Sequence, residues 1–310
     1  MCGNVVKSIV FLLILLVLII LTSLFFANFK VVKHSKTSVL GISGEYENSL
    51  DYLIIGDSET YTSIIPLEIW KTYGYAGYVC GTPGQKLNQT YDILKEALIN
   101  QNPKVVVLET NAVFRKVQEK NDFVDFINEN FQMFKYHDNW KYIVNSNLKN
   151  SILNEKGYVY SKEIKKSSNA NYGDYSSKKR KLKSANIEYF QKILDLCKKN
   201  NIKLILLSVP TTKNWNYKKH NAIEELANKY DLEFIDLNID PDINIDWEND
   251  TQDEGDHLNY YGALKVTKHL GKNLDDLKIL KNHKDDKKYQ KWNDNYDEYY
   301  KKYLLKFNNL

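Results

Sequence analysis

Apolar residues are distributed unevenly along this chain, with one continuous run near the amino terminus and several short runs after it. Ser8 to Phe29 is a stretch of 22 residues without a charged side chain. As a helix, which rises about 1.5 Å per residue, this stretch would span about 33 Å, enough to cross the core of a bilayer. The pattern therefore predicts a membrane-spanning helix in residues 8–29, within an anchor segment of residues 1–36.

A cleaved signal peptide is the alternative interpretation of this run. The apolar core of a signal peptide is usually shorter and ends in small residues at alternate positions, whereas phenylalanines interrupt the segment Ser23–Ala27. We therefore favour an uncleaved anchor. Its orientation is less clear, because three lysines follow the run (Lys30, Lys33 and Lys36) and only Lys7 precedes it, so charge counting alone favours a cytoplasmic domain.

The rest of the chain alternates between short apolar runs and amphipathic stretches. The stretches have apolar residues at spacings of three and four, as in Tyr91–Leu98 and Ile187–Cys197, which is typical of helices. The short runs are typical of strands buried on both faces. They predict five strands, at Tyr52–Ile55, Gly77–Cys80, Lys104–Glu109, Lys203–Val209 and Glu233–Leu237. This alternation predicts an α/β fold, a three-layer αβα sandwich around a five-stranded parallel sheet.

Two regions depart from the alternation. Residues 112–184 separate the third strand from the next helix by far more than a usual connection, and we interpret them as an insertion or cap in a domain of residues 37–280. The insertion ends in a basic run, Lys178–Lys183, for which a polyanion site, a nuclear signal and a solvated loop are the alternatives, and we favour the loop. Residues 281–310, rich in Lys, Asp and Tyr, predict a polar helical tail with an aromatic stripe.

Composition and charge narrow the class of protein. The chain has 43 Lys+Arg and 39 Asp+Glu, a net charge of +4, and residues 1–36 hold four lysines and no acidic residue. The remaining 39 basic and 39 acidic groups balance, which does not favour a nucleic-acid partner. Three cysteines exclude a disulfide-stapled mini-protein. We find neither zinc-ligand spacing nor a glycine-rich phosphate loop, so we expect no metal and no cofactor.

The candidate chemistry lies directly after the predicted strands, where α/β proteins bind their ligands. Gly56-Asp57-Ser58 follows the first strand, Gly84 the second and Asn111 the third, and His257 precedes the final helix. A histidine can activate a serine hydroxyl as a general base, and a carboxylate can orient that histidine. The backbone N–H groups of Ser58 and Gly84 and the Asn111 amide are candidate donors to an oxyanion. Together these residue types point to acyl transfer through a covalent serine intermediate.

These four blocks resemble those of the SGNH (GDSL-type) hydrolases, which have a serine, a glycine, an asparagine and a histidine in this order. The resemblance covers about residues 50–275 and implies a flavodoxin-like SGNH fold and a serine esterase. The family's acid is an aspartate three residues before the histidine, a position that Glu254 occupies here, with Asp253 one residue earlier. We expect Asp253 to orient His257, with Glu254 as the close alternative. The segment Glu109–Ala112 departs from the family's Gly-x-Asn-Asp block around Asn111.

A narrower resemblance involves the anchor, the segment Phe134–Trp140, Lys156-Gly157-Tyr158 and the segment 257–263 (HLNYYGA). These are similar to membrane-anchored SGNH proteins of Gram-positive bacteria that act beside a membrane-bound O-acyltransferase, including the D-alanyl-transfer protein of teichoic-acid modification. The resemblance implies an extracellular domain, against the lysine count, and an esterase or O-acyltransferase acting on a cell-surface polysaccharide or teichoic acid, for example in O-acetylation. A catalytically silent scaffold that binds glycan or an O-acyltransferase, and a lipase, are the alternatives.

The other histidines and the later cysteines have simpler interpretations. We expect His137 to be packed or to cap a helix, and His220 and His269 to be solvated on helix surfaces. Cys80 and Cys197 are expected to be buried thiols.

Overall fold

The computed structural model describes residues 2–27, 42, 44–117, 155–168 and 172–305. Its centre is one parallel sheet in the order β2-β1-β3-β4-β5. The strands begin and end within two residues of the predicted runs, at β1 (Tyr52–Gly56), β2 (Gly77–Gly81), β3 (Val105–Glu109), β4 (Lys203–Ser208) and β5 (Glu233–Asp236). The predicted five-stranded parallel sheet is confirmed.

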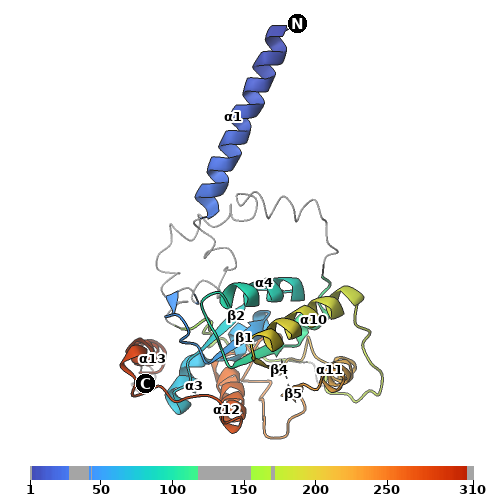
Figure 1. The fold of residues 1–310 in the computed structure, drawn as a ribbon. Helices are drawn as coiled ribbons and strands as arrows, with labels where there is room; N and C mark the ends of the chain where they lie inside the picture. The colour runs from blue at the N-terminus through green and yellow to red at the C-terminus, as the bar shows by residue number, and fades with distance from the viewer. Residues whose placement is uncertain (1, 28–41, 43, 118–154, 169–171, 306–310) are drawn as a thin grey trace.

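Helices cover both faces of the sheet, which makes the molecule three layers deep (Figure 1). Successive residues of a strand point to opposite faces. Thus Leu53 and Ile55 of β1 belong to the core beneath α4 (Leu87–Ala97), α10 (Ser184–Lys199) and α11 (Tyr217–Tyr230). Tyr52 and Ile54 belong to a second core beneath α12 (Tyr260–Asp276). The strands are apolar throughout because both of their faces are buried.

The order of the strands determines where the candidate site lies on the sheet. The chain passes from β1 outward to β2 and then returns to β3 on the other side of β1, before continuing to β4 and β5. The ends of β1 and β3 therefore flank the point where the direction of strand succession reverses, which is where open parallel sheets bind ligands. Ser58 lies directly after β1, in the short helix α2 (Ser58–Ser63), and Asn111 follows β3 at the start of α5 (Asn111–Phe114).

The first helix, α1 (Cys2–Ala27), is long and apolar enough to cross a membrane. A 21-residue segment, Asn4–Leu24, has a mean hydropathy of 3.1 and is not buried against the protein. A signal sequence would meet the same criteria of length and composition.

The tail packs into the main core. Its 3₁₀ turn (Lys287–Tyr289) and α13 (Gln290–Tyr303) lie against α3 (Pro66–Tyr73). Trp292, with its ring centre 5.3 Å from that of Trp70, is buried there. The expected aromatic stripe is thus part of the first core, continuous with the residues beneath α4.

Much of the expected insertion, including Phe131–Trp140 and His137, lies outside the described residues. Residues 112–117 are described, the description resumes at Glu155, and Lys156 there is a buried lysine. The Lys156 ammonium forms an ion pair of 2.7 Å with Glu45 and lies 4.2 Å from the centre of the Trp292 ring. This part of the insertion is therefore integrated with the tail helix.

Candidate active site

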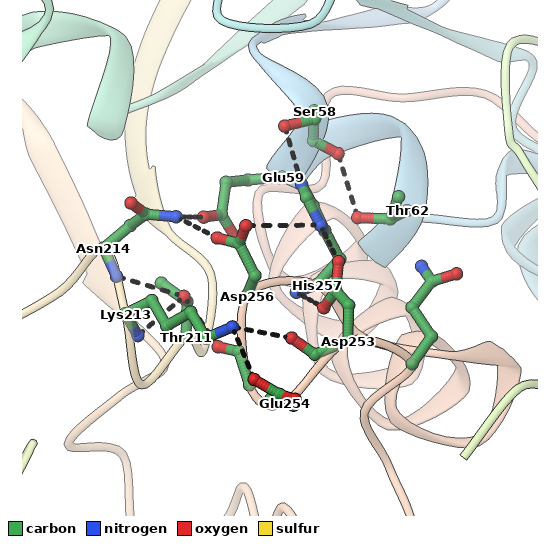
Figure 2. A network of polar contacts seen from close by, with 12 residues as sticks. Ser58, Glu59, Thr62, Thr211, Lys213, Asn214, Asp253, Glu254, Asp256 and His257 are labelled. Carbon is green, nitrogen blue, oxygen red and sulfur yellow. Dashed lines mark hydrogen bonds and ion pairs between the residues drawn. The ribbon is translucent and has the colours of Figure 1, made fainter. Parts of the chain in front are cut away.

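A tight turn at the end of β1 presents Ser58. At Gly56, any side chain would lie 2.6 Å from both Glu109 and Thr60, so only glycine permits this approach. Asp57 then caps α2, since its carboxylate accepts the Glu59 N–H at 3.0 Å. Ser58 is the first residue of α2, and its hydroxyl points toward the loop that precedes α12 (Figure 2).

His257 comes to Ser58 from that loop. Its Nε2 lies 2.7 Å from the Ser58 Oγ, and its Nδ1 lies 2.5 Å from an oxygen of Asp253. The backbone N–H of His257 donates to the other Asp253 oxygen at 2.6 Å. Asn259 holds the loop by capping α12 and donating to the Asn249 carbonyl. Ser58, His257 and Asp253 therefore form one continuous chain of hydrogen bonds (Figure 2).

The charges around Asp253 and His257 favour the protonation states that the serine needs for its activation. Burial opposes ionisation of Asp253, but its hydrogen bonds with His257 outweigh burial and lower the pKa of Asp253. Burial likewise opposes the charged form of His257, yet Asp253, Asp256 and Asp57 raise its pKa above 6.5. With Asp253 ionised, the neutral imidazole carries its proton on Nδ1 and leaves Nε2 free to accept the Ser58 proton.

Glu254 is not the partner of His257 in the structure. Its carboxylate is 70% exposed and lies 3.5 Å from the Lys213 ammonium. Glu254 and Gly255 both have left-handed backbone conformations, with φ of +65° and +90°. This tight turn directs the Glu254 side chain outward and returns Asp253 to the imidazole four residues later. The alternative based on the family's spacing is therefore corrected in favour of Asp253.

Asp256 is a third acidic neighbour of the imidazole, 3.9 Å from the His257 Nδ1. Among the described residues, Asp253, Asp256 and His257 offer ligand atoms within 4.8 Å of one another. The 2.5 Å separation of the His257 Nδ1 and the Asp253 oxygen is that of a hydrogen bond and leaves no room for an ion between them. We therefore interpret this cluster as the support of the histidine.

The three expected oxyanion donors differ in how the structure places them. Ser58 is the first residue of a helix, so its N–H is one of the donors left without a partner inside the helix. Gly84 has a φ of +63°, and a side chain there would meet only Arg115, at 3.9 Å, among the described residues. This open space lets a ligand approach the Gly84 backbone. Asn111 is buried, and its Nδ2 donates to Asp57 at 2.9 Å, which leaves one amide hydrogen for a ligand.

A closed ring of hydrogen bonds includes both sequence neighbours of Ser58, Asp57 and Glu59. Asp57 accepts from the Asn111 Nδ2, and the Asn111 oxygen accepts from the Lys219 ammonium at 3.0 Å. Lys219 also donates to the Asn214 carbonyl, and the Asn214 Nδ2 donates to Glu59 at 2.8 Å. The Glu59 N–H closes the ring on Asp57. The ring joins the ends of β1, β3 and β4 to the first turn of α11.

The ring also fixes which end of the Asn111 amide faces which neighbour. An ammonium group can only donate, so the amide oxygen must face Lys219. A reversed amide would place Nδ2 against the ammonium and its oxygen against the Asp57 carboxylate. The Nδ2 therefore faces Asp57, on the side of Ser58.

Two buried acids complete the floor of the site. Burial raises the pKa of Glu59 well above its ordinary value, and the charges of Asp57 and Glu109 act in the same direction. Burial and Asp57 also raise the pKa of Glu109. In each acid one carboxyl oxygen has no hydrogen-bond partner among the described residues. Burial therefore favours the neutral, protonated form of both carboxyls. Arg115, which forms an ion pair of 2.5 Å with Asp57, balances the remaining charge.

Sequence reasoning missed five residues of this environment: Glu59, Glu109, Asn214, Lys219 and Arg115. None belongs to a spaced motif, and Lys219 stands in a Lys-Lys-His segment that resembles an exposed helix face. One available signal was position, because Asn214 lies in the loop directly after β4. Ligand-binding residues gather at such strand ends.

Two histidines that were expected to be solvated are not. The His220 side chain is only 12% exposed, and its Nδ1 lies 2.8 Å from Asp236. His269 is 16% exposed and lies 3.1 Å from Asp240. Each helix turns its histidine toward an acidic side chain of a loop or strand, which a helical spacing alone does not reveal. Cys80 and Cys197 are buried, as expected, and the structure shows that both are free thiols.

The fold and the site define a parallel α/β protein with a serine, a histidine and an aspartate joined by hydrogen bonds at the switch point of its sheet. No protein-family model and no curated protein matches the chain.

Solved structures similar to the chain are GDSL-type lipases and esterases. A GDSL-like lipase from Bacteroides thetaiotaomicron is 16% identical, with a TM-score of 0.36 over 72% of this chain and 88% of its own. A psychrotrophic esterase from Pseudoalteromonas is 9% identical, with a TM-score of 0.41 over 73% and 98%. A family 3 carbohydrate esterase from Clostridium thermocellum is 14% identical, with a TM-score of 0.39 over 74% and 98%.

Proposed function

We propose that the chain is a membrane-anchored serine esterase or O-acyltransferase that acts on O-acyl groups of a cell-surface polysaccharide or teichoic acid. One observation carries the proposal. The Ser58 hydroxyl lies 2.7 Å from the His257 Nε2, while the His257 Nδ1 lies 2.5 Å from Asp253. This is the arrangement that an activated serine nucleophile requires.

In the first half of the reaction, the Ser58 Oγ attacks the carbonyl carbon of an ester and its proton passes to the His257 Nε2. The carbonyl oxygen becomes an oxyanion, for which the Ser58 and Gly84 N–H groups and the Asn111 Nδ2 are the proposed donors. The carbonyl then re-forms, the bond to the leaving alcohol breaks, and His257 returns the proton to that alcohol. The acyl group is now an ester of Ser58.

In the second half, an acceptor hydroxyl attacks the carbonyl carbon of the acyl-serine while His257 removes its proton. The bond between the acyl group and the Ser58 Oγ then breaks, and His257 returns the proton to Ser58. Water as the acceptor gives hydrolysis, and a polymer hydroxyl gives acyl transfer. Asp253 stabilises the imidazolium formed in both halves and keeps the ring in its orientation. The difference between the two outcomes lies in how well the site admits the polymer and excludes water.

The proposed location is the outer face of the cell membrane. The length and hydropathy of α1 support an anchor, and the resemblance to anchored SGNH proteins favours an external domain. The same resemblance leads us to propose a membrane-bound O-acyltransferase as partner. Digestion of the domain by protease added to intact cells tests the orientation, and protection of the domain would contradict it.

Replacement of Ser58 tests the activity. In the full chain, we expect Ser58→Ala to lower the rate of cleavage of 4-nitrophenyl acetate by about 10⁴-fold or more. It should also abolish surface acylation in cells that express only the variant. Ser168→Ala, at an exposed serine outside the hydrogen-bonded chain of Ser58, His257 and Asp253, is the matched control and should retain both activities.

The outcomes separate the alternatives. Wild-type rates and wild-type acylation in Ser58→Ala would overturn the proposal and favour a silent scaffold. Cleavage of long-chain esters far faster than acetyl esters, with no effect on surface acylation, would identify a lipase instead.

A further inference from the structure

A basic hollow lies beside the site and takes no part in the reaction described above. It has a volume of about 1010 Å³, and twelve of the described residues line it, none of them acidic or aromatic. Seven of the twelve are cationic: Lys116, Lys178, Lys179, Arg180, Lys181, Lys183 and Lys218. Because the chain outside the anchor is neutral as a whole, so many cations in one hollow form a marked local excess of positive charge.

Most of these cations are available to a ligand. Among the described residues, only Lys179 of the seven has an acidic partner, Glu225, at 2.9 Å. The side chains of residues 178–181, of Lys183 and of Lys218 are exposed. A cation that already neutralises a nearby carboxylate attracts a further anion weakly, so a largely unpaired set is the stronger site.

The basic loop is held in place by backbone contacts. The Arg180 N–H donates to the Lys218 carbonyl at 2.7 Å, and Asn221 donates to the carbonyls of Ser176 and Lys178 at 2.6 and 3.0 Å. The expected solvated loop agrees with the structure in that its basic side chains are exposed. Its backbone is nevertheless fixed against the first turns of α11.

The helix termini add to the positive potential. Ser184 and Ala185, the first two residues of α10, line the hollow, and Lys218 lies in the first turn of α11. A helix amino terminus carries a partial positive charge, which acidic residues in the first turn commonly offset. Neither α10 nor α11 has an acidic residue in its first turn. Both termini therefore reinforce the lysines.

The hollow is electrostatically connected to the proposed reaction centre. Lys116 follows Arg115, the ion-pair partner of Asp57, and Lys218 precedes Lys219, which binds Asn111. Arg115 and Arg180 both act on the Lys219 ammonium, and with burial they lower its pKa. Two lining cations, Lys116 and Lys218, are thus sequence neighbours of residues that contact Asp57 and Asn111.

We infer that this basic hollow binds a linear phosphate polymer. This polymer would be the substrate that presents its hydroxyl or ester to Ser58, and that part of the inference rests on the proposed function. The shape opposes a flat bilayer surface, which cannot enter a concave hollow. None of the described lining residues is aromatic, and because the bases of single-stranded nucleic acid stack on aromatic rings, this described lining favours a polymer without bases. The apolar floor, which includes Val117, Leu182 and Ile187, suits the carbon backbone between the phosphates.

The test uses the full chain in zwitterionic nanodiscs and fluorescent inorganic polyphosphate as the probe. We expect the wild type to bind it with a steep salt dependence, because each cation–phosphate contact releases bound counterions. The triple variant Lys178→Gln, Lys181→Gln, Lys183→Gln should lose about tenfold or more in affinity and show a shallower salt slope. The control triple Lys95→Gln, Lys198→Gln, Lys199→Gln removes the same charge from exposed positions outside the hollow and should bind as the wild type does.

Each contrary outcome has a distinct meaning. Equal loss in both triples would show only a general charge effect, and wild-type binding by the first triple would overturn the site. Competition by monomeric glycerol phosphate as strong per phosphate as that of the polymer would assign the hollow to a single headgroup. Tighter binding of single-stranded DNA than of polyphosphate of equal charge would assign it to nucleic acid.

Cleavage of 4-nitrophenyl acetate keeps this inference separate from the proposed function. The first triple leaves the residues around Ser58 intact and should cleave this small neutral ester at the wild-type rate. Polyphosphate binding without any ester cleavage by the wild type would leave the hollow standing and overturn the proposed esterase.

Discussion

Replacing Lys219 with methionine tests whether the hydrogen-bonded ring positions the proposed oxyanion donor. Methionine keeps an unbranched side chain but removes the donor that holds the Asn111 oxygen at 3.0 Å. The Asn111 amide is then held on one side only, by Asp57. Lys219 touches no reacting atom in the proposed mechanism, so it acts as a positioning residue.

The size of the effect follows from the kind of contact that is lost. A hydrogen bond to a charged group contributes about 1.5–3 kcal/mol, and its acceptor here is buried. If that energy served only to orient Asn111 in the transition state, kcat would fall by about 10- to 150-fold. The largest possible loss of transition-state stabilisation is that of removing the donor itself, about 2.7–4 kcal/mol, and we expect this loss for Asn111→Ala. KM for a small neutral ester should change little, because the ground-state carbonyl needs the donor less.

The assay is steady-state cleavage of 4-nitrophenyl acetate by both single variants and by the double variant. If Lys219 acts through Asn111, the double variant should be no slower than Asn111→Ala alone. Lys218→Met, at the exposed neighbouring position, is the control and should keep the wild-type kcat. A double variant that loses the product of the two single effects would refute the reasoning, and so would an unchanged kcat in Lys219→Met.

Three further predictions concern the acids around His257. Asp253→Asn should lower kcat on the same ester by about 10³- to 10⁴-fold, whereas Glu254→Gln should stay within about twofold, and the reverse ranking would contradict the site. Activity should rise with pH through a pKa above 6.5, because His257 must be neutral to accept a proton, and Asp256→Asn should shift this rise to lower pH. A pH–rate profile that does not move would contradict the role of Asp256. The pKa of Glu59 is raised in the folded protein, whereas in the unfolded chain it is near 4.5. Folding therefore retains a proton that the unfolded chain releases. The contribution of Glu59 to stability is present at acidic pH and is lost as the pH rises toward its folded pKa. In thermal melts, Glu59→Gln should therefore match the wild type near pH 5 and be more stable near pH 8, and an equal difference at both would exclude this linkage.

The sheet was predictable because burial on both faces imposes one simple pattern. Val105–Leu108 is a run of four apolar residues, and all four are buried. The alternation of such runs with helical stretches then leaves few possible folds. The tail was harder to interpret. Trp292 and Tyr299 stand among many charged residues, and only the packing of α13 on α3 reveals that both rings are buried.

The serine, the histidine and the aspartate were predictable for a different reason, since each follows a strand or precedes a helix at a recognisable position. The choice between Asp253 and Glu254 could not be settled by spacing. It depends on the left-handed conformations of Glu254 and Gly255, which reverse the chain between the acid and His257. A side chain at Gly255 would lie 2.0 Å from the Thr212 hydroxyl, so the loop after β4 shapes this turn.

The ring explains why the missed residues are single polar side chains from separate elements. The ends of parallel strands meet only in the folded sheet, so a network that joins β1, β3, β4 and α11 leaves no local spacing in the sequence. Each residue of the ring supplies a hydrogen-bond partner for another residue of the ring. Lys219, for example, donates to the Asn214 carbonyl and at the same time orients Asn111. Because its neighbour Lys218 lines the basic hollow, the first turn of α11 connects the proposed polymer site to the proposed oxyanion site.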